Sequence, residues 1–439
     1  MQKHWIFGVF VIGLTGFAIW GLPTVPFHPD EATYLFMSKD LETLFSQPDT
    51  LGFDEGKREE QAQIYRTIDA PLTRYLLGLG RLAFGLAALP TDWDWGMSWG
   101  ENAQAGALPS EALLFTGRLA VTLLLPFSLL MTYTIARKLG GVSAGWVAGI
   151  LFGLNALTLL HTRRAMAEGP LVFGVLFALW SFLNADQKPW LAGLGMAVAY
   201  NSKQSALALL PLGVLAVIWT KRMKEAGGAE MNPTFADKVR RMVEQFVSPA
   251  NLRQVGRQLV LFFVIFGTVT FALNPVYWQN TGAALRASVT SRAELLSRQV
   301  ADAERLAPEQ LLESPGERLA VLLGQLYVLP LQFFEVGNYQ TQTATMVQGY
   351  LAIPEHTLFR GLIGGGVLLS LTILGMVRGG IEIARKGITR TRGLVFLFLA
   401  TGLMGGGLLL VVPLPYQRYS LSLLPLVILW MGLAIKGKK

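Results

Sequence analysis

The amino-acid sequence predicts an all-α protein that crosses a membrane many times, and two of its properties carry this prediction. Of its 439 residues, 52% are hydrophobic and only 15% are charged, whereas about 25% of the residues of a soluble globular protein carry a charge. The hydrophobic residues are also gathered into long blocks, and about 20 consecutive apolar residues span a bilayer as a helix. We therefore expect a polytopic bundle of about ten transmembrane helices.

Ten apolar segments supply the predicted spans. They are residues 5–22, 112–136, 144–160, 170–184, 189–202, 205–220, 257–273, 358–377, 393–412 and 417–435. No small-residue cleavage site follows the first segment, so we interpret it as a retained membrane helix rather than a signal peptide.

The formal net charge of +8 is explained by the orientation of the chain in the membrane. Lys and Arg concentrate on the cytoplasmic side of membrane proteins, and the basic runs are Arg137-Lys138, Lys221–Arg257, Arg378–Arg392 and Lys436–Lys439. With these runs and both termini on the cytoplasmic side of an inner or plasma membrane, the ten spans alternate, provided that the apolar stretch 319–334 is an interfacial or re-entrant helix. Nucleic-acid binding would need a basic face, which the sequence does not show.

This topology divides the chain into three parts. Residues 1–220 form a transmembrane module that includes the first extracytoplasmic loop, 23–111. Residues 221–256 form a cytoplasmic connector, and residues 257–439 form a second transmembrane module with the outer loop 274–357.

The first outer loop carries two helical patterns that predict juxtamembrane helices. Apolar residues share one helical face at Tyr34, Met37, Leu41, Leu44 and Phe45. The second pattern covers residues 71–89, with Pro71 in its first turn. Its less apolar face carries Arg74, Gly78 and Arg81. We expect both helices to lie flat in the membrane interface.

Asp30 and Glu31 follow the first predicted span directly, in the segment His28-Pro29-Asp30-Glu31. One interpretation is structural, because acidic residues in a first helical turn cap free N–H groups and oppose the helix dipole. The other is catalytic: Asp30 would be a general base toward an incoming hydroxyl group, with Glu31 supporting it. The two interpretations are compatible for Glu31.

Cationic residues at membrane depth lie on the same predicted outer face as Asp30. They are Arg118, Arg163, Arg164, Lys203 and Arg418. Charges at the edge of the hydrocarbon are costly and usually functional, although each could also extend to the lipid headgroups. Such a cluster suits a lipid phosphate and would stabilise it as a leaving group. The remaining residues predicted to line the acceptor or sugar pocket are His28, Tyr34, Glu168 and Tyr419.

The sequence predicts no required metal or other cofactor. It has no Cys, and this absence excludes thiol catalysis and disulfides. It also has only four His, which leave little room for a His-built metal site. Oxygen atoms of Asp30, Glu31 and Glu168 could nevertheless be offered to a divalent cation. Two interpretations of Trp93, Trp95 and Trp99 stay open, namely stacking on a sugar ring and anchoring of the loop in headgroups.

A set of motifs resembles the GT-C glycosyltransferases, in particular the protein O-mannosyltransferases and the lipid A aminoarabinose transferase of the family 39 type. The matching segments follow the family's order: Asp30-Glu31 with Tyr34, Asp69-Ala70-Pro71-Leu72, Arg118-Leu119, Arg163–Pro170, Ser202-Lys203, Asn274-Pro275, and Arg418-Tyr419 through Pro425. Each motif alone is weak, but their order is fairly specific, and the set covers most of the chain.

The resemblance implies a GT-C bundle with a catalytic module in residues 1–220 and an extracytoplasmic active site. The donor would be a polyprenyl-phosphate sugar, transferred with inversion to a hydroxyl or amine of a protein, lipid or glycan. By this analogy Asp30 is the base, and Arg163, Arg164 and Lys203 bind the phosphate. Two departures matter: Ala70 replaces a Pro, and Glu168 replaces an Asp. No large soluble module follows the seventh span, so we do not carry over protein mannosylation.

Two other classes of function remain as alternatives. A transporter or lipid flippase would be expected to show inverted repeats and charges near the bilayer midplane, neither of which the sequence shows. The second alternative is a non-catalytic subunit of a membrane complex, in which the motifs are degenerate.

Overall fold

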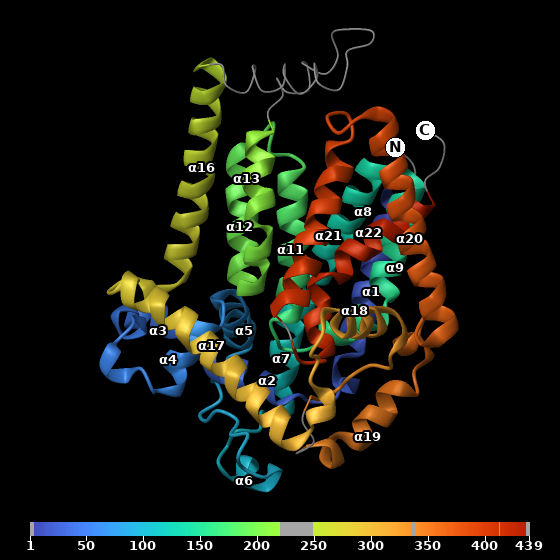
Figure 1. Ribbon diagram of the computed structural model, residues 1–439. Helices are drawn as coiled ribbons and strands as arrows, with labels where there is room; N and C mark the ends of the chain where they lie inside the picture. Colours follow the sequence, from blue (N-terminus) through green and yellow to red (C-terminus); the bar gives the residue numbers. More distant parts are fainter. Residues whose placement is uncertain (1–3, 220–248, 336–338, 412, 436–439) are drawn as a thin grey trace.

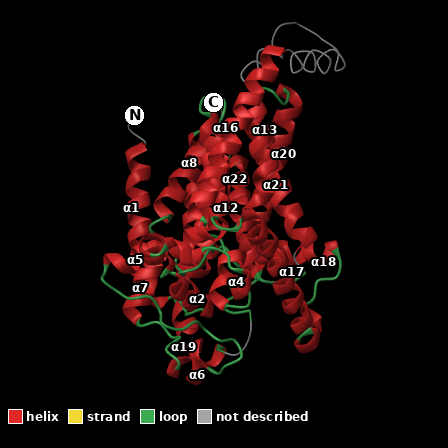
Figure 2. Cartoon of the chain, turned by 90° about the vertical axis from the view of Figure 1, so that its left-hand side faces the viewer, coloured by secondary structure: helices red, strands yellow, loops and turns green. Residues whose placement is uncertain are grey.

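The computed structural model describes residues 4–219, 249–335, 339–411 and 413–435, and throughout these ranges the regular structure is helical. Long helices stand side by side in a bundle, and shorter helices gather at one end of it (Figure 1). We call this end the loop end. The chain begins and finishes at the opposite end, and a view turned by 90° shows the same division (Figure 2).

The bundle contains most of the apolar helices. They are α1 (His4–Trp20), α7 (Glu111–Thr122), α8 (Leu125–Gly140), α9 (Val142–Leu154), α11 (Glu168–Phe182), α12 (Pro189–Ser202), α13 (Leu210–Ile218), α16 (Pro249–Leu273), α20 (Gly361–Lys386), α21 (Arg392–Val411) and α22 (Leu424–Ala434). Four continuous stretches are long and apolar enough to cross a membrane, namely Glu111–Gly140, Leu252–Leu273, Gly361–Lys386 and Arg392–Val411. The count of ten spans therefore stays a prediction.

The remaining α-helices are short, except for α17 (Thr281–Leu306). They are α2 (Pro29–Met37), α3 (Asp40–Ser46), α4 (Gln61–Ile68), α5 (Pro71–Ala83), α6 (Trp99–Gln104), α10 (Ala156–His161), α18 (Pro315–Leu323) and α19 (Gln340–Leu351). Several 3-10 helices connect them, among them η1 (Leu22–Thr24), η4 (Gln204–Leu209), η8 (Pro354–Thr357) and η9 (Gln417–Ser422), and η7 (Gly324–Val328) is a π-helix.

Several predicted spans are broken helices, and particular residues explain the breaks. The predicted span 112–136 is divided between α7 and α8, where Pro126 lies in the first turn of α8. Proline cannot continue a helix because it lacks an N–H donor. The predicted span 144–160 is interrupted at Asn155, whose side chain accepts a 2.9 Å hydrogen bond from the N–H of Leu157 and so caps α10. Hydropathy does not detect such breaks.

The helices of the first outer loop turn their polar faces toward the protein. The predicted helix around residues 34–45 is two helices, α2 and α3, which meet at Ser38. Arg81 of α5 is fully buried and donates hydrogen bonds to Ser38 Oγ at 2.8 Å and to the Leu86 carbonyl at 3.0 Å. Leu79 and Leu82 on the other face are exposed. An outward apolar face is the pattern of a helix that lies on a membrane.

The apolar stretch 319–334 begins and ends at the loop end of the bundle (Figure 1). Near its start, Arg318 donates a 3.0 Å hydrogen bond to the carbonyl of Leu409, close to the end of α21. Near its end, the N–H of Gln332 donates to Gln417 Oε1 at 2.8 Å. Most of the predicted cytoplasmic connector, residues 221–248, lies outside the described residues.

Two glycines of α20 allow a test of this packing. Gly375 lies against α22, where an added Cβ would overlap the backbone oxygen of Trp430, whereas an added Cβ at Gly366 would meet nothing within 4 Å. We expect Gly375→Ala to destabilise the protein by about 1–3 kcal/mol, the usual cost of overpacking. Thermal unfolding in detergent measures this. Gly366→Ala is the matched control, and an equal effect of both substitutions would contradict the α20–α22 contact.

Candidate active site

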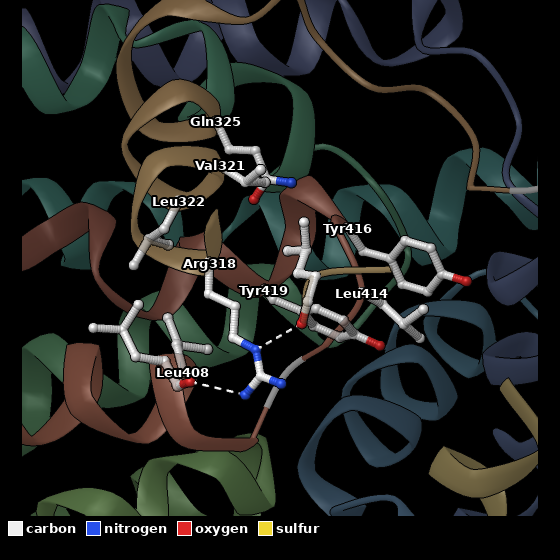
Figure 3. A pocket seen from close by; sticks show the side chains of 10 residues that line it. Arg318, Val321, Leu322, Gln325, Leu408, Leu414, Tyr416 and Tyr419 are labelled. Atoms are coloured by element: carbon white, nitrogen blue, oxygen red, sulfur yellow. Dashed lines mark hydrogen bonds between the residues drawn. The ribbon is translucent and has the colours of Figure 1, made fainter. Parts of the chain in front are cut away.

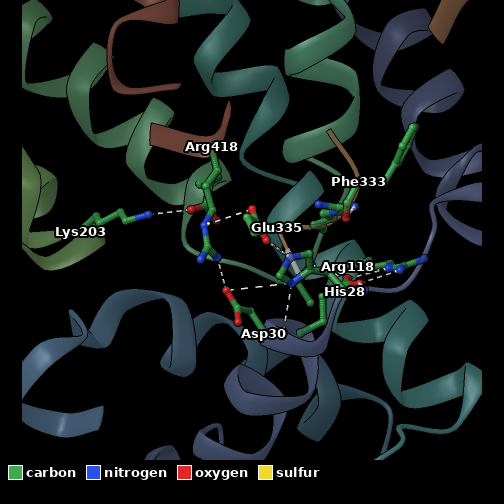
Figure 4. Close-up of polar contacts among 11 residues, drawn as sticks. His28, Asp30, Arg118, Lys203, Phe333, Glu335 and Arg418 are labelled. Atoms are coloured by element: carbon green, nitrogen blue, oxygen red, sulfur yellow. Dashed lines mark hydrogen bonds and ion pairs between the residues drawn. The ribbon is translucent and has the colours of Figure 1, made fainter. Parts of the chain in front are cut away.

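The residues predicted to carry chemistry meet where the bundle joins the loop helices (Figure 4). They come from six parts of the chain. They are His28 and Asp30 at the start of α2, Arg118 in α7, Arg163 and Arg164 after α10, Glu168 at the start of α11, Lys203 after α12, and Arg418 in η9. The end of the apolar stretch 319–334 adds Glu335, which hydrogen-bonds His28.

Glu31 and Arg118 form a buried ion pair beneath this site. Arg118 donates through Nε to Glu31 Oε1 and through Nη2 to Oε2, both at 2.8 Å. Glu31 also accepts from the N–H of Ala165 at 2.9 Å and from the N–H of His28 at 3.0 Å. Burial raises the pKa of Glu31, but the charge of Arg118 and its hydrogen bonds outweigh burial and hold it below its ordinary value.

The predicted role of Arg118 in phosphate binding does not agree with this geometry. Its remaining nitrogen, Nη1, donates to the carbonyls of Leu22 at 3.0 Å and Val25 at 2.8 Å. Each of its three nitrogen atoms therefore has a partner within the protein, and its side chain is 2% exposed. Arg118 is placed to hold the start of α2, not to contact a ligand.

Asp30 lies one residue before Glu31, and its carboxylate points toward Arg418 (Figure 4). Its N–H donates to His28 Nδ1 at 3.1 Å, so the side chain of His28 caps α2. Its carboxylate accepts a hydrogen bond from Arg418 Nη1. Asp30 is 23% exposed and Arg418 is 16% exposed. These two groups can therefore reach a bound molecule, whereas Glu31 cannot.

Glu335 completes the site, and the sequence did not predict it. His28 Nε2 lies 2.7 Å from Glu335 Oε2. Since His28 Nδ1 accepts from a backbone N–H, Nε2 carries the proton and donates it to the carboxylate. Arg418 Nε lies 3.4 Å from Glu335 Oε1. Burial raises the pKa of Glu335, but the charge of Arg418 and the hydrogen bond from His28 outweigh burial and lower it well below its ordinary value.

One sequence signal could have identified Glu335. It is the only acidic residue between Glu317 and Glu355, in a stretch that is otherwise mostly apolar. It belongs to no motif, however, and its two partners are 307 and 83 residues away along the chain.

Reciprocal hydrogen bonds join the segments that carry Glu335 and Arg418. The N–H of Gln332 donates to Gln417 Oε1 at 2.8 Å, and the N–H of Gln417 donates to Gln332 Oε1 at 2.7 Å. Gln417 Nε2 also donates to the carbonyl of Pro330 at 3.0 Å. We call this set of contacts the glutamine clasp.

Lys203 approaches the site from the side opposite Glu335 (Figure 4). Its ammonium group donates to Glu168 Oε1 at 2.6 Å, and Lys203 is 19% exposed while Glu168 is 2% exposed. Asp69 is half-buried nearby. Burial raises the pKa of Asp69, and the charges of Arg292 and Lys203 oppose this rise. Burial, followed by the charges of Asp69 and Glu168, raises the pKa of Tyr34.

Arg163 and Arg164 are fully buried behind the site. Arg163 Nη1 lies 2.7 Å from His356 Nε2, and its guanidinium covers the ring of Phe17 at 5.0 Å. Arg164 Nη2 donates to the carbonyl of Phe333 at 2.8 Å. Among the described residues, Arg163 Nε, Arg163 Nη2 and Arg164 Nε have no hydrogen-bond partner. Both arginines therefore keep donor capacity, although neither is open to solvent.

A small pocket, lined mostly by apolar side chains, adjoins the site next to Tyr419 (Figure 3). Its walls come from α18, the end of α21 and η9. The lining residues are Leu312, Arg318, Val321, Leu322, Gln325, Leu408, Leu409, Leu414, Tyr416 and Tyr419. Arg418 lies between Tyr416 and Tyr419 in sequence and covers both rings, at 5.8 and 6.0 Å. Arg418 therefore contacts two of the residues that line the pocket.

Two tryptophans of the first outer loop, Trp93 and Trp95, differ in their exposure to solvent. Trp93 is 2% exposed and packs against Phe27 and Trp99, with ring centroids 5.9 and 5.6 Å away. It belongs to the protein core, which neither sequence interpretation included. Trp95 is exposed, with its ring 6.1 Å from that of Tyr339.

The carboxylates that were considered for a divalent cation do not share one ligand position. Asp30 pairs with Arg418, Glu31 with Arg118, and Glu168 with Lys203. Within the described ranges, no three His, Asp or Glu side chains gather as a metal site would require.

Comparison with solved structures defines the class of fold. The chain has the membrane fold of the GT-C glycosyltransferases. It is similar to the oligosaccharyltransferase AglB of Archaeoglobus fulgidus, with a TM-score of 0.50 and 13% sequence identity over 97% of this chain and 48% of that chain. The chain thus spans about half the length of that relative, and at this identity the likeness concerns the fold alone.

Two further solved structures are similar at lower TM-scores. The Pmt1-Pmt2 protein O-mannosyltransferase of S. cerevisiae, bound to its sugar donor, has a TM-score of 0.39 and 16% identity over 65% of this chain and 35% of that chain. ArnT from Cupriavidus metallidurans, bound to undecaprenyl phosphate, has a TM-score of 0.35 and 12% identity over 98% and 78%. Neither a protein-family profile nor the sequence of a curated protein matches this chain.

Substitution of Glu31 tests the buried ion pair. Glu31→Gln leaves Arg118 buried without a counter-charge, so we expect a loss of about 3–5 kcal/mol of stability at neutral pH. Because the pKa of Glu31 is lowered on folding from its ordinary 4.5, its stabilisation is present above that value and is lost as the pH falls through the folded value. Thermal unfolding of both proteins should therefore differ at neutral pH and converge well below pH 4.5. A difference that stays constant with pH would contradict this account.

Proposed function

We propose that the protein is a membrane glycosyltransferase that moves a sugar from a polyprenyl phosphate to a hydroxyl or amine of an acceptor, on the extracytoplasmic face of the cell membrane. One observation carries the proposal. A partly exposed carboxylate, Asp30, contacts the partly exposed cation Arg418 at the loop end of a GT-C bundle, and a second partly exposed cation, Lys203, approaches the same site from another side. A base and an anion-binding group are the two parts that such a transfer needs.

The transfer would be a single displacement with inversion. The acceptor oxygen or nitrogen attacks the anomeric carbon and gives its proton to Asp30. The bond from the anomeric carbon to the phosphate oxygen breaks, and its electron pair stays on the phosphate. Arg418 and Lys203 would stabilise the charge that develops there. The products are a glycosylated acceptor and a polyprenyl phosphate, and Asp30 then returns its proton to solvent.

The other predicted residues would support this chemistry from behind. Arg163 and Arg164 keep free donors in a buried position, so they would raise the positive potential at the phosphate and could bind it after a small movement. Glu31 and Arg118 would position Asp30 by fixing the start of α2. His28, Tyr34 and Tyr419 would line the space for the sugar and the acceptor.

The apolar pocket beside Tyr419 would receive the isoprenoid chain of the donor. An isoprenoid is purely hydrocarbon, and the pocket walls are mostly leucine and valine. The chain would run between α18 and α21, which places the phosphate at its end near Arg418.

Transfer of a radiolabelled sugar tests the reaction and the base together. We expect the purified protein to transfer label from one member of a panel of polyprenyl-phosphate sugars to membrane or protein acceptors. Asp30→Asn should lower the rate by at least about 100-fold, the effect of losing a general base, while the melting temperature stays the same. Glu304→Gln, an exposed carboxylate of α17, should remain fully active. Full activity of the Asp30 variant would refute the mechanism.

Replacement of Lys203 tests the phosphate site. Lys203→Gln removes one charge-assisted hydrogen bond to the donor, so the KM for the donor should rise about tenfold with a smaller change in kcat. Lys203→Arg should restore most of the affinity, because it keeps the charge next to Glu168. Lys57→Gln, an exposed cation of the first outer loop, is the control. Equal KM values for Lys203→Gln and the control would exclude Lys203 from the phosphate site.

A further inference from the structure

Arg418 lies between two carboxylates that differ in their freedom to move. Its Nη1 bonds to Asp30, and its Nε lies 3.4 Å from Glu335 Oε1. Glu335 is 9% exposed and is fixed by the hydrogen bond from His28, whereas Asp30 is 23% exposed. Of the two partners of Arg418, Asp30 is therefore the one that can be displaced.

The contact with Arg418 occupies one of the two carboxylate oxygens of Asp30, because Arg418 Nη1 donates to Asp30 Oδ2. That oxygen can receive a proton from the acceptor only when Arg418 no longer donates to it. Separation from Arg418 therefore makes the whole carboxylate of Asp30 available to an acceptor.

A phosphate that enters this site must compete with a carboxylate for each exposed cation. Lys203 holds Glu168, which is 2% exposed at the start of α11 and has no open space to enter. Arg418 holds Asp30, which borders the open part of the site (Figure 4). The phosphate would therefore take the place of Asp30 on Arg418 while Glu335 keeps the guanidinium where it is.

We propose that Glu335 is a positioning residue that retains Arg418 for the donor phosphate, and that binding of the phosphate to Arg418 releases Asp30 as the base. This inference rests on the function proposed above and deepens it. Its consequence is an order of events: the carboxylate of Asp30 becomes fully available only after the donor has bound. An acceptor that arrives first meets a carboxylate whose Oδ2 is held by Arg418.

Two matched substitutions test this inference through the direction in which each changes the affinity for an anion. The test does not require catalysis. Asp30→Asn and Glu335→Gln each remove one negative charge beside Arg418. Simple repulsion predicts that both tighten the binding of an anion. Release of Asp30 predicts opposite signs: Asp30→Asn frees Arg418 and tightens binding, whereas Glu335→Gln leaves Arg418 held by Asp30 alone and weakens it. Glu335→Asp, which keeps the charge, should restore part of the loss.

Undecaprenyl phosphate is the probe, titrated into the full-length protein in lipid nanodiscs. We expect each shift in affinity to be at least about fivefold, the lower end of typical coupling between linked sites. Glu304→Gln serves as the control for a distant outer carboxylate and should leave the affinity unchanged. Affinity changes of the same sign for Asp30→Asn and Glu335→Gln would overturn the inference.

A double-mutant cycle with Arg418→Gln gives a second and independent test. In the Arg418→Gln background, Asp30→Asn should no longer tighten the binding of undecaprenyl phosphate, because the guanidinium that Asp30 occupies is absent. An undiminished effect in that background would overturn the inference, and the comparison of signs stands alone if Arg418→Gln does not fold. A wild-type protein that does not bind undecaprenyl phosphate at all would instead refute the proposed donor, so the two failures are distinguishable.

Discussion

The buried ion pair of Glu31 and Arg118 is the interaction on which the rest of the site depends. It joins the turn after α1, the start of α2, the middle of α7 and the loop after α10 through six hydrogen bonds. A buried charge without its partner is strongly destabilising, so these four segments have one low-energy arrangement. Because Asp30 directly precedes Glu31 in the chain, the ion pair also fixes the backbone position of Asp30. The partly exposed carboxylate of Asp30 is thus positioned by the fully buried carboxylate of Glu31.

Pairing of each carboxylate with its own cation is the second organising feature. Asp30, Glu31 and Glu168 each contact a different positive side chain, and Glu335 shares Arg418 with Asp30. Opposite charges favour the ionised forms of both partners, so the polar groups stay charged in a region that excludes much of the water. The charges of these side chains therefore nearly balance. An anionic ligand would exchange one of these carboxylate–cation contacts for its own contact with the cation.

Hydropathy was sufficient to predict a helical membrane protein, because a membrane helix must satisfy its own backbone and so needs a long apolar segment. Asp30 and the cations became candidates because each lies near the end of such a segment. Glu335 could not, since its partners are distant in sequence and the tertiary fold alone brings them together. The role of Arg118 was missed for the same reason: a cation within a span predicts a partner, but sequence does not say whether that partner is a ligand or Glu31. The breaks at Pro126 and Asn155 needed cap chemistry, which hydropathy ignores.

The glutamine clasp has a consequence for how this site could change over generations. Its two backbone-to-side-chain bonds are reciprocal, so replacing either glutamine leaves a buried N–H of the other segment without an acceptor. Glu335 is three residues beyond one glutamine, and Arg418 directly follows the other. A substitution in one segment therefore changes the support of the other, despite their separation in the gene. A change of specificity here would be expected to involve both segments together.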